Sequence, residues 1–73
     1  MKLFSEWVRK TRRGAEITLR DLSEASGLSE GFISEFERSG RDGITIDNAR
    51  RIANALGTTL GAVLKELEND DKP

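Results

Sequence analysis

The side chains that could do chemistry in this chain are almost all charged: it has 12 lysines and arginines, 13 aspartates and glutamates, and no histidine, cysteine or tyrosine. Histidine is the commonest general base and metal ligand, and cysteine supplies thiolates and disulfides. Without them, we expect no histidine-based catalytic or metal site, no thiolate metal site and no disulfide. The acidic residues do not follow the spacing of a calcium-binding loop. Because no nucleophile–base set can be assembled from what remains, we expect no enzyme, no metal and no cofactor.

The charges are distributed unevenly along the chain, although the net charge is only −1. Residues 1–20 contain six basic and two acidic side chains, whereas residues 21–40 contain one basic and five acidic side chains. A basic N-terminal segment beside an acidic middle predicts an edge of the fold that faces phosphate groups. The alternative is an ordinary solvated helix face, and composition alone favours that alternative.

Residues 18–38, TLRDLSEASGLSEGFISEFER, have the pattern of two short helices joined by a tight turn. Thr18 and Asp21 have the spacing of a capping box at the start of the first helix, and Gly27 suits the left-handed conformation that ends it. Ser29 then caps the second helix. Leu22 and Ala25 are expected to face the core, and apolar residues recur at helical spacing in the second helix at Phe32, Ile33 and Phe36. So short a connection forces a steep angle between the helices, as in a helix-turn-helix, whose second helix can enter the major groove of DNA.

The remaining segments predict three further helices, and hence an all-α fold with a single domain over residues 1–67. We expect a first helix over residues 3–13, a connection over residues 14–17 and a loop over residues 39–43. A fourth helix begins at Thr45 or Asp47 and ends at Gly57, and Thr59 caps a fifth. Residues 68–73 are expected to form a polar, frayed tail. No hydrophobic run approaches a membrane span and the N-terminus lacks the apolar core of a signal peptide, so the expected location is the cytoplasm.

An ordered set of short motifs extends over residues 4–64 without a gap. The motifs are Phe4, Val8 and Arg12 in the first helix, the Thr18-x-x-x-Leu22 opening, Gly27-Leu28-Ser29, Ile33-Ser34, Glu37-Arg38 and Ile52-Ala53-x-Ala55-Leu56-Gly57. Each motif is weak alone, but in this order and spacing the chain resembles the lambda repressor and Cro family of helix-turn-helix proteins, also called the XRE family. The short length and the linker at residues 41–46 are also similar to restriction-modification controller proteins and small phage repressors. The resemblance implies a compact five-helix DNA-binding domain.

The resemblance implies that the second helix of the helix-turn-helix reads base edges in double-stranded DNA. The matching positions are Ser29, Glu30, Gly31, Phe32, Ser34 and Glu35. Many relatives have glutamine, arginine or lysine where this chain has Glu30 and Glu35, and Leu19 stands where a DNA-contacting glutamine is common. A carboxylate can accept a hydrogen bond from cytosine N4, although it repels phosphates. Phe32 either touches a thymine methyl group or covers the core, and the alternative for the whole helix is a solvated acidic face.

Phosphate contacts are expected from the family's cap position and from basic groups around the rim of the same helix. These residues are Thr18, Arg20, Arg38, Arg41, Lys10 and Arg13. For any single arginine, an exposed surface charge is an equal alternative. The resemblance also implies an internal ion pair between Arg12 and Glu37, which would tie the first helix to the DNA-reading helix.

The resemblance further implies a symmetric homodimer whose two reading helices lie about one DNA turn apart, roughly 34 Å. The seam is expected near Ile44, Ile46, Leu60, Val63, Leu64 and Leu67, although the apolar stripe of the fifth helix is first a core face. The predicted function is a sequence-specific DNA-binding transcriptional regulator, in the first place a repressor of a phage, mobile-element or restriction-modification promoter. The alternative is a protein-interaction module of the same fold, an antirepressor or antitoxin, whose acidic helix binds a basic protein partner.

Overall fold

The computed structural model describes residues 4–39 and 44–70, and five α-helices account for most of these residues. The helices are α1 (Phe4–Gly14), α2 (Leu19–Ser26), α3 (Glu30–Ser39), α4 (Ile46–Ala55) and α5 (Leu60–Asp70). Strands are absent from these two ranges, and the expected all-α fold is confirmed. None of the helices in them is long and apolar enough to cross a membrane.

Local sequence fixes the ends of α2 and the start of α3, as expected. The Thr18 hydroxyl accepts a hydrogen bond from the backbone N–H of Asp21 at 3.0 Å, and the Asp21 carboxylate accepts one from the backbone N–H of Thr18 at 3.3 Å. This reciprocal capping box satisfies N–H groups that have no partner inside the helix. Gly27 ends α2 with a φ of 79°, in the left-handed region that favours glycine. The Ser29 hydroxyl then accepts from the backbone N–H of Phe32 at 3.1 Å and caps α3.

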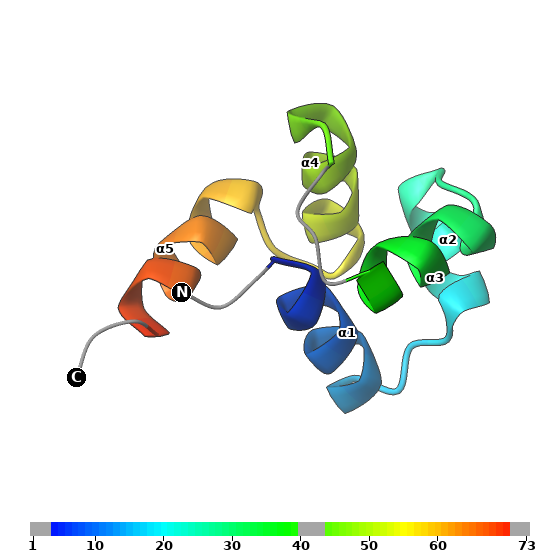
Figure 1. Cartoon of the computed structure of the whole chain (residues 1–73), viewed down its shortest axis with the longest axis horizontal. Helices are drawn as coiled ribbons and strands as arrows, with labels where there is room; N and C mark the ends of the chain where they lie inside the picture. The colour runs from blue at the N-terminus through cyan, green and yellow to red at the C-terminus, as the bar shows by residue number, and fades with distance from the viewer. Residues whose placement is uncertain (1–3, 40–43, 71–73) are drawn as a thin grey trace.

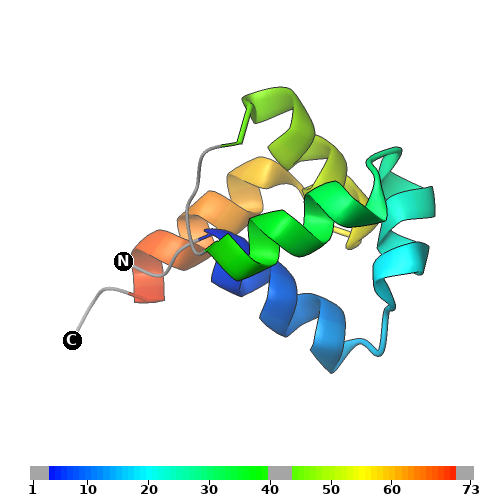
Figure 2. The same cartoon turned by 45° about the vertical axis from the view of Figure 1, so that its right-hand side comes forward.

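The helices pack so that α3 is held by its neighbours on one side and left open on the other. α3 packs against α1 and α2, α2 also packs against α4, and α4 packs against α5. Figure 1 shows α2 and α3 at one end of the molecule and α5 projecting from the opposite end. In the turned view of Figure 2, α3 crosses the front of the molecule, with α1 below it and α4 above.

The core receives buried side chains from all five helices. Its members are Phe4, Trp7, Val8, Leu22, Ile33, Phe36, Ala49, Ile52, Ala53, Val63 and Leu67. The ring of Phe4 lies between those of Trp7 and Phe36, with ring centroids 5.9 and 5.8 Å away. Each large apolar side chain that is fully buried stabilises the fold by about 1.5–3 kcal/mol before entropy is counted, so this cluster fixes where α3 lies.

One expected core residue was wrong. Ala25 is exposed, and the α2 residue that joins Leu22 in the interior is Ser26, one helical turn further along. The Ser26 hydroxyl accepts from the backbone N–H of Leu28 at 3.2 Å, so this buried polar group is satisfied by the turn between α2 and α3.

The last helix is longer than expected. The Thr59 hydroxyl accepts from the backbone N–H of Ala62 at 3.2 Å, which confirms its capping role. α5 then continues to Asp70, so residues 68–70 are helical rather than part of a frayed tail. No glycine or proline occurs between residues 62 and 72, so the sequence contains no residue that would end the helix at Leu67. The predicted loop at residues 39–43 lies mostly outside the described residues, and so does Arg41.

Candidate nucleic-acid interface

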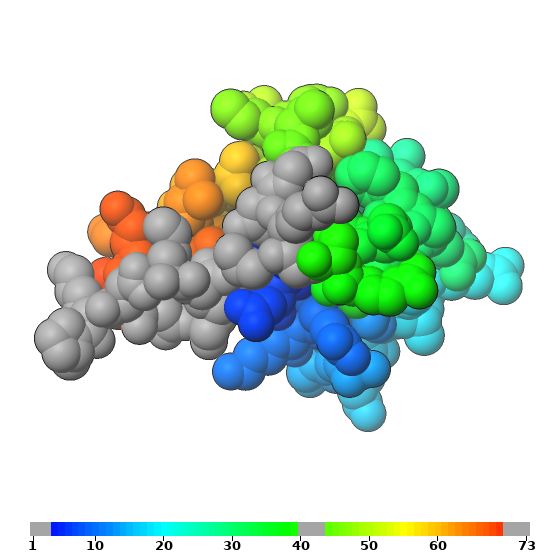
Figure 3. Space-filling view, viewed as in Figure 1, coloured from blue at the N-terminus to red at the C-terminus, as the bar shows by residue number. Residues whose placement is uncertain are grey.

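The outward face of α3 carries most of the side chains expected to read bases. Glu30, Gly31 and Glu35 are exposed, and the Phe32 ring is 37 % exposed, whereas Ile33 and Phe36 on the same helix are buried. A Cβ atom added to Gly31 would meet no other atom within 4 Å, so the backbone there is open to close approach. In the space-filling view of Figure 3, atoms of α3, in green, form part of the molecular surface on the right-hand side.

Two of the predicted base-reading residues have structural contacts as well. The Ser29 hydroxyl is exposed but accepts from the Phe32 N–H as the cap of α3. Ser34 is half-buried and faces a hollow between α1 and α3, together with Leu19 from α2. The longer side chains on the outward face are therefore those of Glu30, Phe32 and Glu35.

An ion pair between α1 and α3 holds the orientation of the reading helix. Arg12 Nε donates to Glu37 Oε2 at 2.8 Å and Arg12 Nη2 donates to Oε1 at 2.9 Å, so the pair is bidentate. The two side chains are only 12 % and 7 % exposed. The hydrogen bonds that Arg12 donates to Glu37 raise the pKa of Arg12, against the opposing effect of burial. The pair expected from the resemblance is thus present, and its two charge-assisted hydrogen bonds fix the geometry of both side chains. Loss of either partner would leave an uncompensated, partly buried charge.

The same arginine also fixes the connection between α1 and α2. Arg12 Nη1 donates to the backbone oxygen of Ile17 at 2.9 Å. This connection contains Glu16 with a φ of 58°, a left-handed conformation that costs a non-glycine residue about 1–2 kcal/mol. Since one guanidinium contacts both α3 and this connection, Arg12 sets the position of α2 and α3 relative to α1.

Arginines gather in a hollow of about 370 Å³ on the side of α3 that faces α1. It is lined by Arg9, Arg12, Arg13, Leu19, Ser34, Glu37 and Arg38. Because Arg12 is neutralised by Glu37, the remaining arginines give the hollow a positive charge beside the reading helix. A neighbouring hollow of about 430 Å³ is lined by Glu6, Arg9, Lys10 and Arg13. We call the three arginines Arg9, Arg13 and Arg38 the arginine rim.

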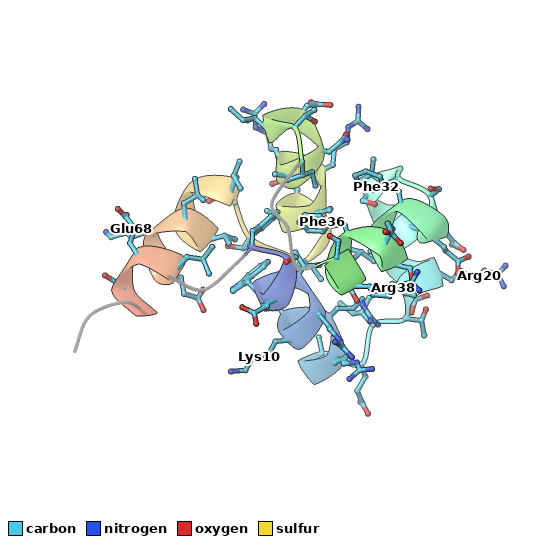
Figure 4. All side chains as sticks on the ribbon, in the orientation of Figure 1. Lys10, Arg20, Phe32, Phe36, Arg38 and Glu68 are labelled. Carbon is cyan, nitrogen blue, oxygen red and sulfur yellow. The ribbon has the colours of Figure 1, made fainter. Side chains whose placement is uncertain are left out.

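The structure brings together only some of the residues expected to bind phosphate. Arg13 and Arg38 line one hollow, and Lys10 lies in the next hollow beside Arg13. Figure 4 shows Lys10 and Arg20 pointing away from the body at widely separated places. Arg20 Nε lies 3.3 Å from Glu24 Oε1, and Arg38 Nη2 lies 3.3 Å from Glu35 Oε2; all four side chains are at least two-thirds exposed. Such exposed pairs are weak, so both arginines can leave their partners for a phosphate.

Two arginines near the interface were missed from the sequence. Arg9 belongs to the run of basic residues in α1, but only the packing of α1 against α3 places it in both hollows. Arg51 on α4 lies over the turn between α2 and α3, where its Nη1 atom is 3.3 Å from a Cβ built on Gly27. Arg51 Nε also donates to Asp47 Oδ2 at 3.1 Å. No local pattern predicts either placement, since both depend on contacts between distant helices.

The residues expected at a dimer seam fall into three groups by their burial. Val63 and Leu67 are 0 % and 3 % exposed and belong to the domain's own core, so they are not free to contact a second copy. Ile44 and Leu60 are half-buried and pack against the same core. Ile46 and Leu64 are 69 % and 50 % exposed. The expected placement of Val63 and Leu67 at a seam is therefore wrong, because both side chains lie in the domain's own core, on a helix that packs against α4.

The structure has a capped α2, a turn at the left-handed Gly27, and an α3 that packs against α1 and α2 and is exposed on its other side. These features define a helix-turn-helix DNA-binding domain. The helix-turn-helix family model matches residues 8–63, and the chain belongs to this family of DNA-binding transcriptional regulators. Among curated proteins, no sequence matches the chain.

Two solved structures of one bacterial regulator are similar to this chain over nearly all its length. Both are the clp gene regulator ClgR from Corynebacterium glutamicum. The first is 33 % identical, with a TM-score of 0.79, and the match covers 94 % of this chain and 72 % of that one. The second is 32 % identical, with a TM-score of 0.77, and the match covers 97 % of this chain and 91 % of that one.

Proposed function

We propose that this protein is a dimeric repressor that binds a palindromic operator through α3. The observation that carries the proposal is the outward face of α3, with Glu30, Phe32 and Glu35 exposed, directly beside the arginine rim. An exposed helix suits base reading in the major groove, and arginines at its flank suit the phosphates that border the groove. Backbone N–H groups at the starts of α2 and α3 add to the phosphate contacts.

Two further features support this function. The clp gene regulator, whose structure the chain resembles, is a gene regulator by name. The small size of the domain favours control by concentration rather than by a bound ligand, and occupancy of a promoter then blocks polymerase. A phage, mobile-element or restriction-modification promoter, reached in the cytoplasm, is the setting that the sequence resemblance favours.

The proposed dimer places Ile46 and Leu64 at the seam. Both are large apolar residues that are at least half exposed in the single chain, and contact with a second copy would remove them from water. They lie on α4 and α5, and Figure 1 shows α5 at the far end of the molecule from α2 and α3. A two-fold axis there leaves both reading helices free to enter successive major grooves, roughly 34 Å apart.

The experiment that tests DNA reading is selection of bound duplexes from a randomised pool, at near-physiological salt, followed by sequencing. We expect a two-fold symmetric motif with its half-sites about one DNA turn apart. A motif without symmetry would contradict the dimer but not the DNA-binding function. Failure of a folded protein to enrich any motif would contradict the proposal itself.

The seam is tested by the substitution Leu64→Glu, which places a charge in the proposed contact without removing a core side chain. We expect a folded monomer by analytical ultracentrifugation and much weaker operator binding, because each half-site is then bound singly. Asn69→Glu adds the same charge to an exposed position of α5 and serves as the control. A Leu64→Glu protein that still dimerises would remove this residue from the seam.

One observation favours a second candidate function, a protein-interaction module. Glu30 and Glu35 on the outward face of α3 are carboxylates, which repel the phosphates of DNA and attract a basic protein surface. Selective, salt-dependent binding of one duplex over random DNA supports the repressor. Equal and weak binding of all duplexes, with tight binding of a basic protein partner, supports the alternative.

A further inference from the structure

The outward side chains of α3 offer hydrogen-bond acceptors and an apolar ring. Glu30 and Glu35 are exposed, and an ionised carboxylate accepts hydrogen bonds but donates none. Phe32 lies three residues before Glu35, so the two side chains are neighbours on one helix face. Gly31 contributes no side chain. A partner that reaches the exposed side chains of α3 must therefore present donors and an apolar group.

The hydrogen-bond donors among the side chains of α3 are either short hydroxyls or belong to the last turn of the helix. The hydroxyls are those of Ser29, which caps the helix, of Ser34, which is half-buried in the arginine-lined hollow, and of Ser39, which donates to the backbone oxygen of Phe36 at 3.2 Å. Arg38 is the only lysine, arginine, asparagine or glutamine of the helix, and it belongs to the last turn. Its guanidinium lines the hollow with Arg9 and Arg13 and contacts Glu35 at 3.3 Å. Arg38 thus lies beside Glu35 at the last turn of the helix and next to Arg9 and Arg13, and we assign it to a phosphate at the edge of the groove.

The four bases differ in what they show in the major groove. Guanine shows two acceptors, N7 and O6, which would face the carboxylates unfavourably. Cytosine shows the N4 amino donor, and adenine shows its N6 donor beside the N7 acceptor. Thymine shows a methyl group, as does any pyrimidine methylated at C5. Cytosine is consequently the base that best suits a carboxylate, and a 5-methyl pyrimidine is the one that best suits Phe32.

We propose that α3 reads donors instead of guanine acceptors: Glu30 and Glu35 accept hydrogen bonds from cytosine N4 groups, and Phe32 packs on the methyl group of a neighbouring pyrimidine. This inference rests on the proposed function, and it names the bases that the operator half-site presents. The guanines that pair with those cytosines are left without a side-chain contact at N7.

The test uses the full chain and the operator recovered by selection, with single base analogues placed in one half-site. 7-Deazaguanine removes the N7 acceptor, N4-methylcytosine replaces the major-groove N–H with a methyl group, and uracil removes the thymine methyl; all three retain base pairing. We expect 7-deazaguanine to change affinity by less than about twofold. At the contacted positions, N4-methylcytosine should weaken binding by about tenfold or more and uracil by about threefold, since a good base contact discriminates by that order.

A matched pair of variants tests the role of Glu35. In Glu35→Gln the amide donates as well as accepts, so renewed selection should replace cytosine with adenine at one position, and 7-deazaadenine there should weaken binding. Glu68→Gln changes an exposed glutamate of α5 in the same way, far from Phe32 and Arg38 in Figure 4, and should leave the motif unchanged.

The outcomes separate this inference from the function beneath it. If an operator is selected but 7-deazaguanine weakens binding tenfold, guanine is read, and the inference is overturned while the repressor stands. If the motif of Glu35→Gln is unchanged, Glu35 is not a reader, which also overturns the inference. If no duplex is selected at all, both the base-reading inference and the proposed repressor function are contradicted. The exposed carboxylates of α3 are then assigned to a protein partner.

Discussion

Glu35 and Glu37 lie two positions apart on α3, and their surroundings differ in every respect. Glu37 is 7 % exposed and accepts two hydrogen bonds from Arg12, at 2.8 and 2.9 Å. Glu35 is 70 % exposed and has one long contact of 3.3 Å with Arg38. One carboxylate orients the helix and the other is available to a ligand. The difference arises from which side of the helix each occupies, since two residues turn a helix by roughly 200°.

The same division applies to other residue pairs of this small domain. Phe36 is buried against Phe4, whereas Phe32, one helical turn before it on α3, is 37 % exposed. Arg12 is held by Glu37, whereas its neighbour Arg13 is exposed in the hollow. Residue type therefore does not assign a role in this protein. The inward face of α3 determines stability, and we propose that the outward face and the arginine rim determine binding.

The largest expected difference is between the two phenylalanines. Phe36→Ala should lower the free energy of unfolding by about 3–5 kcal/mol, because it leaves a cavity in the core. Phe32→Ala should lower it by less than about 1 kcal/mol, since the ring is only partly covered. Urea denaturation followed by circular dichroism measures both. Equal losses would mean that Phe32 belongs to the core and would remove it as a candidate base reader.

A somewhat smaller difference is expected between the two glutamates. Glu37→Gln leaves the guanidinium of Arg12 without its counter-charge in a partly buried position, and should cost about 3 kcal/mol. Glu35→Gln should cost less than about 0.5 kcal/mol. Because the pKa of Arg12 is raised, its contribution is fully present below the ordinary pKa of arginine and is lost only when pH rises through the higher folded value.

The Glu37→Gln loss should therefore be the same at neutral and mildly alkaline pH, as measured by urea denaturation in both buffers. The double variant Arg12→Met, Glu37→Leu provides the control, because it removes both charges and should recover most of the stability. A double variant no more stable than Glu37→Gln would show that the pair is needed for more than mutual neutralisation.

Features set by neighbouring residues could be predicted from the sequence. The capping box of Thr18 and Asp21, the left-handed Gly27 and the caps at Ser29 and Thr59 depend on a few adjacent positions. The helix count and most of the core followed from apolar periodicity.

Features set by packing between helices could not be predicted in this way. Ser26 is buried in place of Ala25 because α3 and α4 pack against that side of α2. Val63 and Leu67 are buried in the core of the single domain. The partners Arg12 and Glu37 are 25 residues apart, so only the family resemblance indicated their contact. Arg9 entered the site through the packing of α1 on α3. The base-reading and phosphate-binding assignments themselves remain predictions.

The smallest expected effect concerns Arg13 of the arginine rim, which is exposed, unlike its neighbour Arg12. Arg13→Ala should leave the free energy of unfolding within about 0.5 kcal/mol, because the side chain is exposed. If Arg13 contacts a phosphate, the substitution should weaken binding to operator and random duplex alike, on the order of fivefold near physiological salt. The slope of log affinity against log salt should fall in magnitude by about 1.

Fluorescence anisotropy over a salt series measures both the affinity and the slope. Arg50→Ala, which changes an exposed arginine of α4 outside the rim, is the control. An unchanged slope would exclude Arg13 from the phosphate contacts, and a weakening confined to the operator would instead make it a base reader.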